Sequence, residues 1–187
     1  TMARRIAYTG SAVLTVDDVA YQCRVDAEDL QPELIEQIII PGVTVQAEQR
    51  TGAAIREATY EEDWPESRAS GSPLDVGQAS EVLKVERILP DGTLEELALA
   101  DAPRHLRRGQ RESCLHFTGG RPVGPLRITY KAGLDIEANP GVRNWMLMHA
   151  GSAYAQRETW VVGTILASIP SSYMDSLLAD ITVPPRF

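Results

Sequence analysis

Cys114 and His116 come nearest to a catalytic arrangement in this sequence. Because they are two residues apart, their side chains would lie on the same face of a β-strand, which is the minimum requirement for a thiol nucleophile beside a base. Cysteine is also among the most buried residue types, and every alternating strand produces this spacing. The pattern therefore favours ordinary strand packing, and a small enzyme using Cys114 and His116 stands as the alternative.

The remaining polar clusters are weaker candidates for chemistry. His149 falls in the apolar stripe of a predicted helix, which is typical of a packed, hydrogen-bonded histidine. The acidic cluster at 61–63 and Glu66 could serve acid–base or metal chemistry, but it borders a loop and lacks the spacing of a calcium-binding loop, which favours a solvated acidic edge. Segment 119–124 is glycine-rich, but it lacks the Lys-Ser/Thr ending of a phosphate-binding loop, and Pro122 has no N–H to offer. We expect no catalytic residue, no cofactor and no metal site.

The composition is that of a folded, acidic protein. Of the 187 residues, 43% are hydrophobic and 24% are charged, and the formal net charge is −8. A chain of this length can bury roughly 70% of its unfolded surface. The acidic balance argues against tight, non-specific binding to nucleic acid, which requires clustered Lys and Arg. Short basic clusters at 4–5 and 104–111 are interpreted as solvated loops or contacts with an acidic partner, with phosphate contact as the alternative.

Neither disulfides nor a membrane span are expected. Cys23 and Cys114 show no CxxC or metal-ligand spacing, which favours free thiols in a reducing compartment. No stretch approaches the ~20 apolar residues of a membrane helix, because Ile38-Ile39-Ile40 is followed at once by Pro41-Gly42. No secretory signal is visible at the start of the sequence. We therefore expect no membrane partner.

Helical patterns occupy both ends of the sequence. Thr15 and Asp18 form the signature of a capping box for a helix that ends near Arg24. A second helix should begin near Pro32 and end at Gly52, with a kink or a break at Pro41, or as two separate short elements. The residues expected to form its buried stripe are Leu34, Ile35, Ile38, Ile39, Gly42 and Val45.

The late helical pattern begins at Asn139-Pro140, a cap followed by a first-turn proline. Thr159–Ile169 is an apolar connector without clear periodicity. Pro170 opens a last short helix, and Pro184-Pro185 prevents its extension. The apolar stripe of the late helix is expected at Val142, Trp145, Met146, His149 and Ala153.

The middle of the sequence shows strand and turn signals. Asp91-Gly92 predicts a tight hairpin, because both residues readily adopt positive φ. Segment 64–77 is rich in Pro, Ser and Gly and should form a surface loop. The fold class is therefore α+β, with a helical frame at 2–52 and 134–187 and an antiparallel β insert at 53–133. The predicted strands are Ala54–Tyr60, Glu81–Leu89, Leu94–Leu99, Ser113–Thr118 and Leu126–Lys131.

Taken together, these motifs resemble the phage head-tail connector family, in particular longer adaptors that carry a β insert between their helices. In this sequence Ala179–Val183 lengthens the usual ending, and Pro41-Gly42 interrupts a helix that is usually continuous. The residues that carry the resemblance are Leu14–Val19, Arg24–Asp26, Glu28-Asp29, Leu34-Ile35, Arg50–Ile55, Tyr154–Glu158, Ile169-Pro170 and Leu177-Leu178.

The resemblance implies a non-enzymatic virion structural protein at the head-tail junction, assembled in the host cytoplasm. Its implied partners are copies of itself in a ring, the portal protein, a tail or head-completion protein, and DNA that passes through the channel without specific binding. A plain protein-binding module unrelated to phages is the remaining alternative. For the ring interface we predict Glu36, Gln46, Arg50, Tyr154 and Arg157.

Overall fold

The computed structural model describes residues 3–156 and 171–185, and the fold is α+β. Contacts divide the chain into two compact units. The helical unit consists of residues 12–51 and 135–180, and the strand unit of residues 1–11, 52–134 and 181–187. Each unit is therefore assembled from segments that are distant in the sequence.

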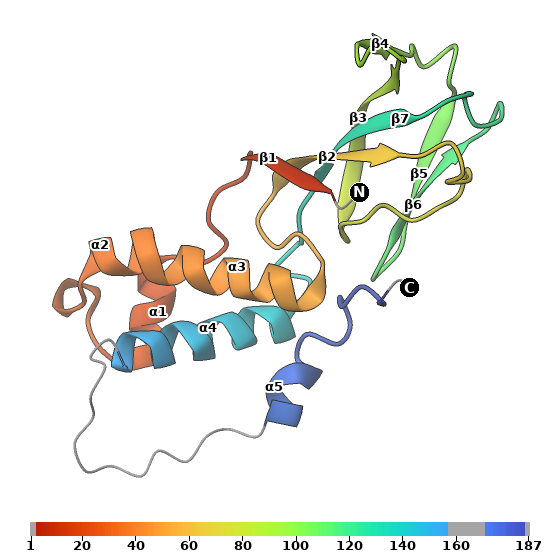
Figure 1. Ribbon diagram of the computed structural model, residues 1–187. Helices are drawn as coiled ribbons and strands as arrows, with labels where there is room; N and C mark the ends of the chain where they lie inside the picture. Colours follow the sequence, from red (N-terminus) through yellow and green to blue (C-terminus); the bar gives the residue numbers. More distant parts are fainter. Residues whose placement is uncertain (1–2, 157–170, 186–187) are drawn as a thin grey trace. The chain divides into compact units, whose positions relative to one another are not determined.

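The helical unit is built around α1, α3 and α4, which lie side by side in Figure 1. Thr15 caps α1 as predicted: its hydroxyl accepts from the Asp18 amide at 3.2 Å, and Asp18 Oδ2 accepts from the Thr15 amide at 2.8 Å. The helices are α1 (Val16–Cys23), α2 (Pro32–Leu34), α3 (Ile40–Thr51), α4 (Pro140–Ala155) and α5 (Ser171–Ser176).

The second helical stretch differs from its prediction around Pro41. Helical residues run without a break from Pro32 to Thr51, and α2 and α3 are joined by a π-helical segment, Ile35–Ile39. The Ile40 amide donates to the Ile35 carbonyl, so the wide turn comes directly before the proline. A proline cannot donate an amide hydrogen and crowds the preceding turn, and a wider turn is one way to accommodate it.

The π-helical segment changes which residues are buried. Ile35, Ile39 and Ile40 are buried, whereas Ile38 is 63% exposed and Gly42 is exposed. A wider turn advances each residue by less than the usual 100°, so the buried face passes from Ile35 to Ile39 and Ile40. The predicted stripe was therefore wrong at Ile38 and Gly42.

The late helix begins where it was predicted. Asn139 precedes α4, and its carbonyl accepts from the Val142 amide at 3.1 Å. Val142, Trp145 and Met146 are buried, as expected from the apolar stripe, whereas Ala153 is exposed. The predicted connector Thr159–Ile169 and the helix-opening Pro170 lie outside the described residues.

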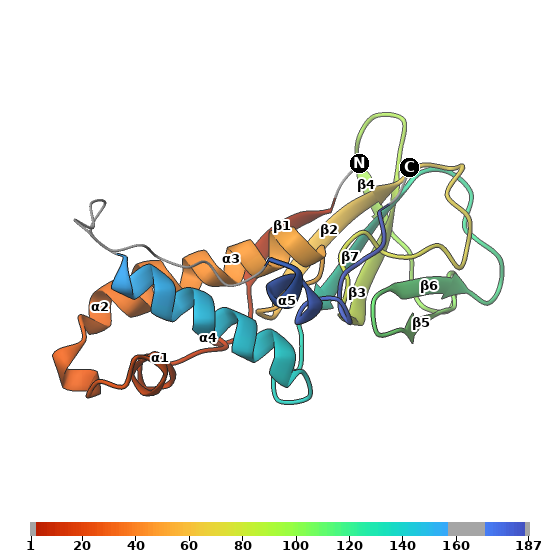
Figure 2. The same cartoon turned by 90° about the horizontal axis from the view of Figure 1, so that it is seen from below.

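The strand unit contains a five-stranded antiparallel sheet and a separate two-stranded hairpin. The order in the sheet is β1-β2-β7-β3-β4, so the last strand in the chain is central. The hairpin is β5-β6, drawn next to β3 in Figure 2. The strands are β1 (Arg4–Tyr8), β2 (Ala58–Trp64), β3 (Ala79–Ile88), β4 (Leu94–Glu96), β5 (Arg104–Arg108), β6 (Ser113–Phe117) and β7 (Leu126–Ala132).

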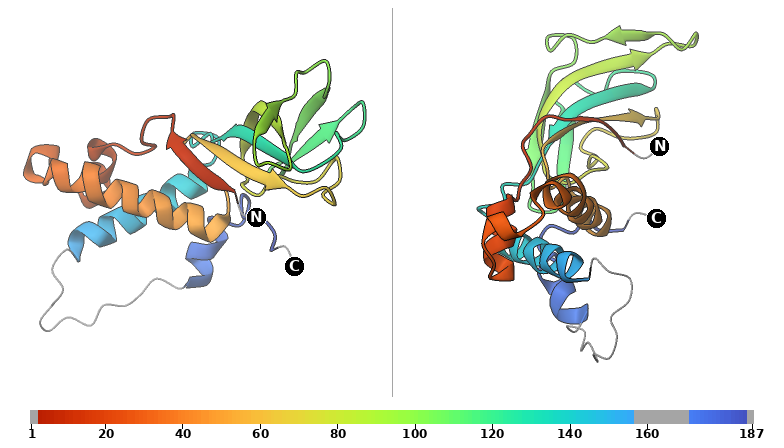
Figure 3. Two further views of the ribbon diagram at one scale, coloured as in Figure 1. Left: turned by 45° about the horizontal axis from the view of Figure 1, so that its top comes forward. Right: turned by 90° about the vertical axis from the view of Figure 1, so that its left-hand side faces the viewer.

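Two of these strands were not predicted. β1 and β5 are rich in arginine, and each is ordered by its neighbour: β1 pairs with β2 (Figure 3, left), and β5 pairs with β6. β2 begins at Ala58 rather than Ala54, and β4 ends at Glu96 rather than Leu99. The Asp91-Gly92 hairpin is confirmed, with the Leu89 amide donating to the Thr93 carbonyl at 2.9 Å. Of the two residues only Gly92, at φ 83°, adopts positive φ, so the expectation for Asp91 was wrong.

The core of the strand unit lies between the sheet and the β5-β6 hairpin. Leu115 and Phe117 of β6 pack with residues of β2, β3 and β7, and the Trp64 and Phe117 rings meet edge to face at 6.4 Å. β2 alternates strictly between buried and half-buried positions, as a strand with one covered face should. The hairpin is thereby fixed on the sheet by apolar packing.

Candidate functional site: charged surfaces on the two units

Cys114 and His116 lie on the half-buried face of β6 and do not form a catalytic pair. Residues two apart on a strand are about 6.6 Å apart, well beyond hydrogen-bonding distance. His116 instead stacks on His105, its cross-strand partner, with ring centroids 5.0 Å apart and an angle of 6° between planes. Arg107 lies opposite Cys114 in the same register. This face is a packed surface of the hairpin, and its geometry does not favour the enzyme alternative.

The three carboxylates at 61–63 are each held by a different partner. Glu61 pairs with Arg4 at 3.0 Å, and Asp63 pairs with Arg127 at 2.7 Å. Glu62 points into the core, where Trp64 Nε1 donates to its Oε1 at 2.5 Å. Successive strand residues face opposite sides, so Glu62 lies on the buried face, and Glu61 and Asp63 on the other face are each held by a different arginine. The three carboxylates therefore do not converge on one ligand, and the prediction of a solvated acidic edge was wrong at Glu62.

Glu62 anchors the loop that follows β2. Its Oε2 accepts from the Asp75 amide at 2.8 Å, and Arg68 lies 3.3 Å from its Oε1. Burial raises the pKa of Glu62, while the hydrogen bonds and the Arg68 charge act in the opposite direction. The predicted loop after Trp64 is therefore ordered by a buried carboxylate as well as by apolar packing of Leu74, which is fully buried in the core.

The glycine-rich segment 119–124 is closed by its own arginine. The Arg121 guanidinium donates to the carbonyls of Pro65, Arg68, Pro122 and Gly124 at 2.6–2.8 Å. These bonds use the donors that would otherwise meet a phosphate, so the segment serves as a structural loop.

His149 is packed and hydrogen-bonded, as predicted. Its Nδ1 lies 2.9 Å from the Trp145 carbonyl, and the two rings stack at 3.7 Å. Across residues 3–156 and 171–185, no group of three or more His, Cys, Asp or Glu side chains is arranged to hold a metal ion. Within the same described ranges, no helix has the length and apolar character needed to cross a bilayer.

The residues predicted for a ring interface fall in the helical unit. Glu36, Gln46 and Arg50 are exposed, and Tyr154 is half-buried on α4. Arg50 also has intramolecular partners, since its Nη1 lies 2.8 Å from Asp175 Oδ1 and its guanidinium 5.9 Å from the Trp145 ring. Arg157 lies outside the described residues.

Charge is distributed unevenly between the units. Among the described residues, the helical unit has 12 acidic and 3 basic side chains, a net charge of −9, whereas the strand unit has 13 of each. Residues 17–36, here called the acidic segment, contain seven carboxylates and one arginine. Six of the carboxylates are exposed: Asp17, Asp26, Glu28, Asp29, Glu33 and Glu36.

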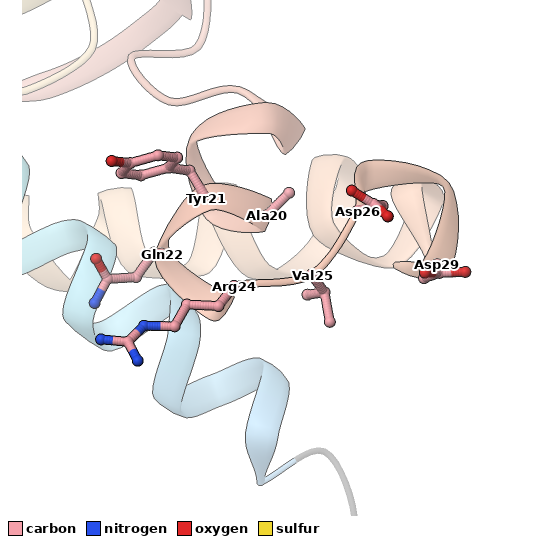
Figure 4. A pocket seen from close by; sticks show the side chains of 7 residues that line it. All are labelled: Ala20, Tyr21, Gln22, Arg24, Val25, Asp26 and Asp29. Carbon is pink, nitrogen blue, oxygen red and sulfur yellow. The ribbon is translucent and has the colours of Figure 1, made fainter.

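An open hollow of about 760 Å³ lies within the acidic segment, where α1 ends (Figure 4). It is lined by Tyr21, Val25, Asp26 and Asp29, among others, and Tyr21 is 89% exposed. Arg24 ends α1 in the left-handed conformation at φ 57°, and the Val25 amide donates to the Ala20 carbonyl at 3.2 Å. Arginine is strained in this conformation because its Cβ approaches the following carbonyl oxygen, and glycine usually occupies such positions for that reason.

The β5-β6 hairpin carries the opposite charge. Residues 104–117, here called the basic hairpin, contain four arginines and one glutamate. Arg107, Arg108 and Arg111 are exposed around its turn. The interpretation of 104–111 as a solvated loop was wrong, because this segment includes β5. The sequence showed the arginines, but only the strand pairing places them on one hairpin.

The exposed Tyr21 was also missed, although the sequence contained its signal. Val16, Val19, Ala20 and Cys23 recur at helical spacing and form the inward face of α1. Tyr21 falls outside that stripe, so a large aromatic residue had to lie on the solvent face.

Solved structures with similar folds come from gene transfer agent particles. A chain from a structure described as "Virion of native gene transfer agent (GTA) particle" superposes with a TM-score of 0.75 at 17% identity. A chain from "Neck of empty GTA particle computed with C6 symmetry" gives 0.73 at 15%, and one from "Neck of native GTA particle computed with C12 symmetry" gives 0.65 at 12%. Each likeness covers 100% of this chain and 98% of the other.

Sequence comparisons add no assignment. No protein-family model matches this chain. No curated protein sequence matches it either. The similarity is therefore one of fold, and it extends over 100% of this chain and 98% of the other.

Proposed function

We propose that this protein is a structural component of the neck of a phage-like particle, acting as a head-tail connector. Copies form a ring between the portal protein and a tail or head-completion protein, and the ring extends the channel for DNA. The observation that carries this proposal is the end-to-end likeness, with a TM-score of 0.75, to a chain of a gene transfer agent virion. A likeness that covers both units is stronger support than a shared helical motif, because it includes the order in which the segments of the two units follow one another along the chain.

The symmetry of the similar structures supports the ring. Two of them are described as necks, with C6 and C12 symmetry. A cyclic ring requires heterologous contacts, in which one patch of each copy meets a different patch of the next. This chain offers such unlike surfaces in its acidic segment and its basic hairpin.

The charge of the helical unit supports passage of DNA without retention. A net charge of −9 over the described part of that unit repels the phosphate backbone wherever the two approach. Specific base contacts are not required of a channel. We therefore expect the wall of the channel to be formed mainly by the helical unit.

Deletion of the gene from a strain that produces the particles tests the connector role. Filled heads without tails should accumulate, and a plasmid-borne copy should restore tailed particles. Normal tailed particles after deletion would rule out the connector. Light-scattering mass of the purified protein, alone and mixed with portal protein, measures ring formation separately from tail attachment.

A further inference from the structure

Opposite charges are concentrated on two segments of the same chain. The acidic segment has a net charge of −6, from seven carboxylates and one arginine, and the basic hairpin has a net charge of +3, from four arginines and one glutamate. Arg107 and Arg111 are exposed, and neither forms an ion pair with another described residue. The positive surface of the hairpin is therefore complementary in charge to an acidic partner.

The basic hairpin is held rigidly enough to act as a docking element. Gln78 Nε2 donates to the Gln110 carbonyl at 2.5 Å, and Ser113 Oγ donates to the Ala79 carbonyl at 3.2 Å. Arg108 donates to the Ser80 carbonyl from the same strand region. Three hydrogen bonds thus tie the hairpin to β3 and to the residue before it, so the hairpin loses little backbone freedom on binding.

The acidic segment supplies both charge and an aromatic anchor. Asp26 and Asp29 lie at one side of the hollow, and Tyr21, whose ring is almost fully exposed, projects from α1 on the other side (Figure 4). A guanidinium binds a carboxylate through two parallel hydrogen bonds and also stacks on an aromatic face. This chain already uses arginine in that way, since Arg5 and Arg56 lie 4.1 and 4.4 Å from the centre of the Tyr8 ring.

We propose that the basic hairpin of one copy docks on the acidic segment of the next copy, with Arg107 and Arg111 facing Asp26, Asp29 and Tyr21. This inference rests on the proposed ring and names its contact surfaces. The contact is heterologous, so it propagates around a ring instead of ending at a dimer. The strained Arg24 lies in the same hollow, as strained residues at contact sites often do.

A second copy fits the hairpin better than DNA does. Three exposed arginines at one turn neutralise only a few phosphates, which gives weak binding at physiological salt. DNA would also be repelled by the chain as a whole, whose formal net charge is −8. The net charge of the acidic segment, −6, is enough to balance the +3 of the hairpin, and every subunit of the ring carries one such segment.

Charge reversal followed by a charge swap tests the contact in the full-length protein. Arg107→Glu with Arg111→Glu should raise the concentration for half-association at least about 10-fold. Asp26→Arg with Asp29→Arg should do the same, and combining all four substitutions should restore association. Arg4→Glu with Arg5→Glu is the matched control, since it changes the charge equally at exposed positions of β1. The contacts that it removes, of Arg4 with Glu61 and of Arg5 with Tyr8, lie within the strand unit, so it should have little effect on association. Light scattering or sedimentation at about 50 mM and about 500 mM salt should show weaker association at high salt.

Engineered cysteines provide the second measurement, which also applies if the purified protein is monomeric. Asp29→Cys with Arg111→Cys, in a background of Cys23→Ser and Cys114→Ser, should give a ladder of oxidised oligomers from purified particles. Each single-cysteine variant should give no ladder. Particles that contain the protein but yield only monomers would refute this contact while leaving the connector role standing.

Two further outcomes would also overturn the inference. One is unchanged association of the Arg107→Glu, Arg111→Glu variant. The other is hairpin-dependent binding to a short DNA duplex together with normal self-association, which would assign the arginines to phosphate instead.

Discussion

The phenolic oxygen of Tyr130 lies 2.9 Å from Oε2 of Glu62 and donates a hydrogen bond to it, with both side chains buried. Burial and the neighbouring carboxyl raise the pKa of Tyr130 well above its usual value, so it remains a donor at neutral pH. The bond connects β7 to β2 and supports the carboxyl that orders the loop after Trp64. A polar network of this kind fixes a unique core but makes stability depend on pH.

Glu62→Gln should reveal that dependence. Because burial raises the pKa of Glu62, the folded state holds its proton more tightly than the unfolded state does. The stability from that proton is present below the ordinary glutamate value of about 4.3 and is lost as pH rises through the raised pKa. Urea unfolding between about pH 4 and pH 7 should therefore show the wild type losing stability relative to the variant, by at most about 1.4 kcal/mol per pH unit. An advantage of the wild type that grows with pH would mean that its donors hold the carboxylate ionised.

Removing the ion pair between α1 and α4 should destabilise the helical unit. Arg143 Nη2 lies 2.8 Å from Asp18 Oδ1, and both side chains are partly buried. Burial acts to raise the pKa of Asp18, but its bonds from Thr15 and Arg143 outweigh that effect and lower it. A double-mutant cycle of Asp18→Ala and Arg143→Ala should give a coupling of about 0.5–1 kcal/mol at neutral pH. The coupling should be lost as pH falls through the lowered pKa.

Glu137 provides the control for this cycle. It also pairs with Arg143, at 3.3 Å, but its side chain is 76% exposed. The cycle of Glu137→Ala and Arg143→Ala should show a smaller coupling, because solvent screens the exposed pair. Equal coupling energies in the two cycles would mean that the partly buried pair of Asp18 and Arg143 stabilises the fold no more than the exposed pair of Glu137 and Arg143.

Truncation of the adjacent isoleucines of the π-helical segment should cost very different amounts of stability. Ile39 is 7% exposed, so Ile39→Ala should cost about 2–4 kcal/mol in the free energy of unfolding. Ile38 is 63% exposed, so Ile38→Ala should cost less than about 0.5 kcal/mol. Urea unfolding followed by circular dichroism measures both values. Similar costs would restore the ordinary helical stripe predicted from the sequence.

That contrast shows which parts of the fold were predictable. The capping box of Thr15 and Asp18, the start of α4 and the Asp91-Gly92 turn are set by neighbouring residues, so a local pattern identified them. The π-helical segment was not predicted, because helical periodicity assumes a constant advance per residue and Pro41 changes it locally.

The unpredicted strands have a different physical origin. Arg4–Tyr8 and Arg104–Arg108 lack apolar alternation, and their order comes from backbone pairing with β2 and β6. The placement of the basic cluster was not predicted, for the same reason. The arginines of 104–111 are visible in the sequence, but their gathering on one hairpin depends on the pairing of β5 with β6.

Gly71→Ala should be costly because the glycine lies against His116. Gly71 has φ +87°, and an added Cβ would lie 3.0 Å from His116 Cε1. Alanine there meets both an unfavourable backbone conformation and crowding, for a total of about 1–3 kcal/mol. Gly120→Ala is the matched control, since Gly120 has φ +94° and nothing within 4 Å of its added Cβ. The extra cost at Gly71 then measures the crowding alone.

Shortening the histidine should recover only that extra cost. In the His116→Ala background, Gly71→Ala no longer meets the ring, so its cost should fall to that of Gly120→Ala. The backbone conformation is unchanged by His116→Ala, so a cost of about 1 kcal/mol should remain. If Gly71→Ala costs the same with and without the His116 ring, the ring does not confine the glycine. The backbone at Gly71 must then be held against β6 by hydrogen bonds, such as that from the Gly71 amide to the Leu115 carbonyl at 2.8 Å.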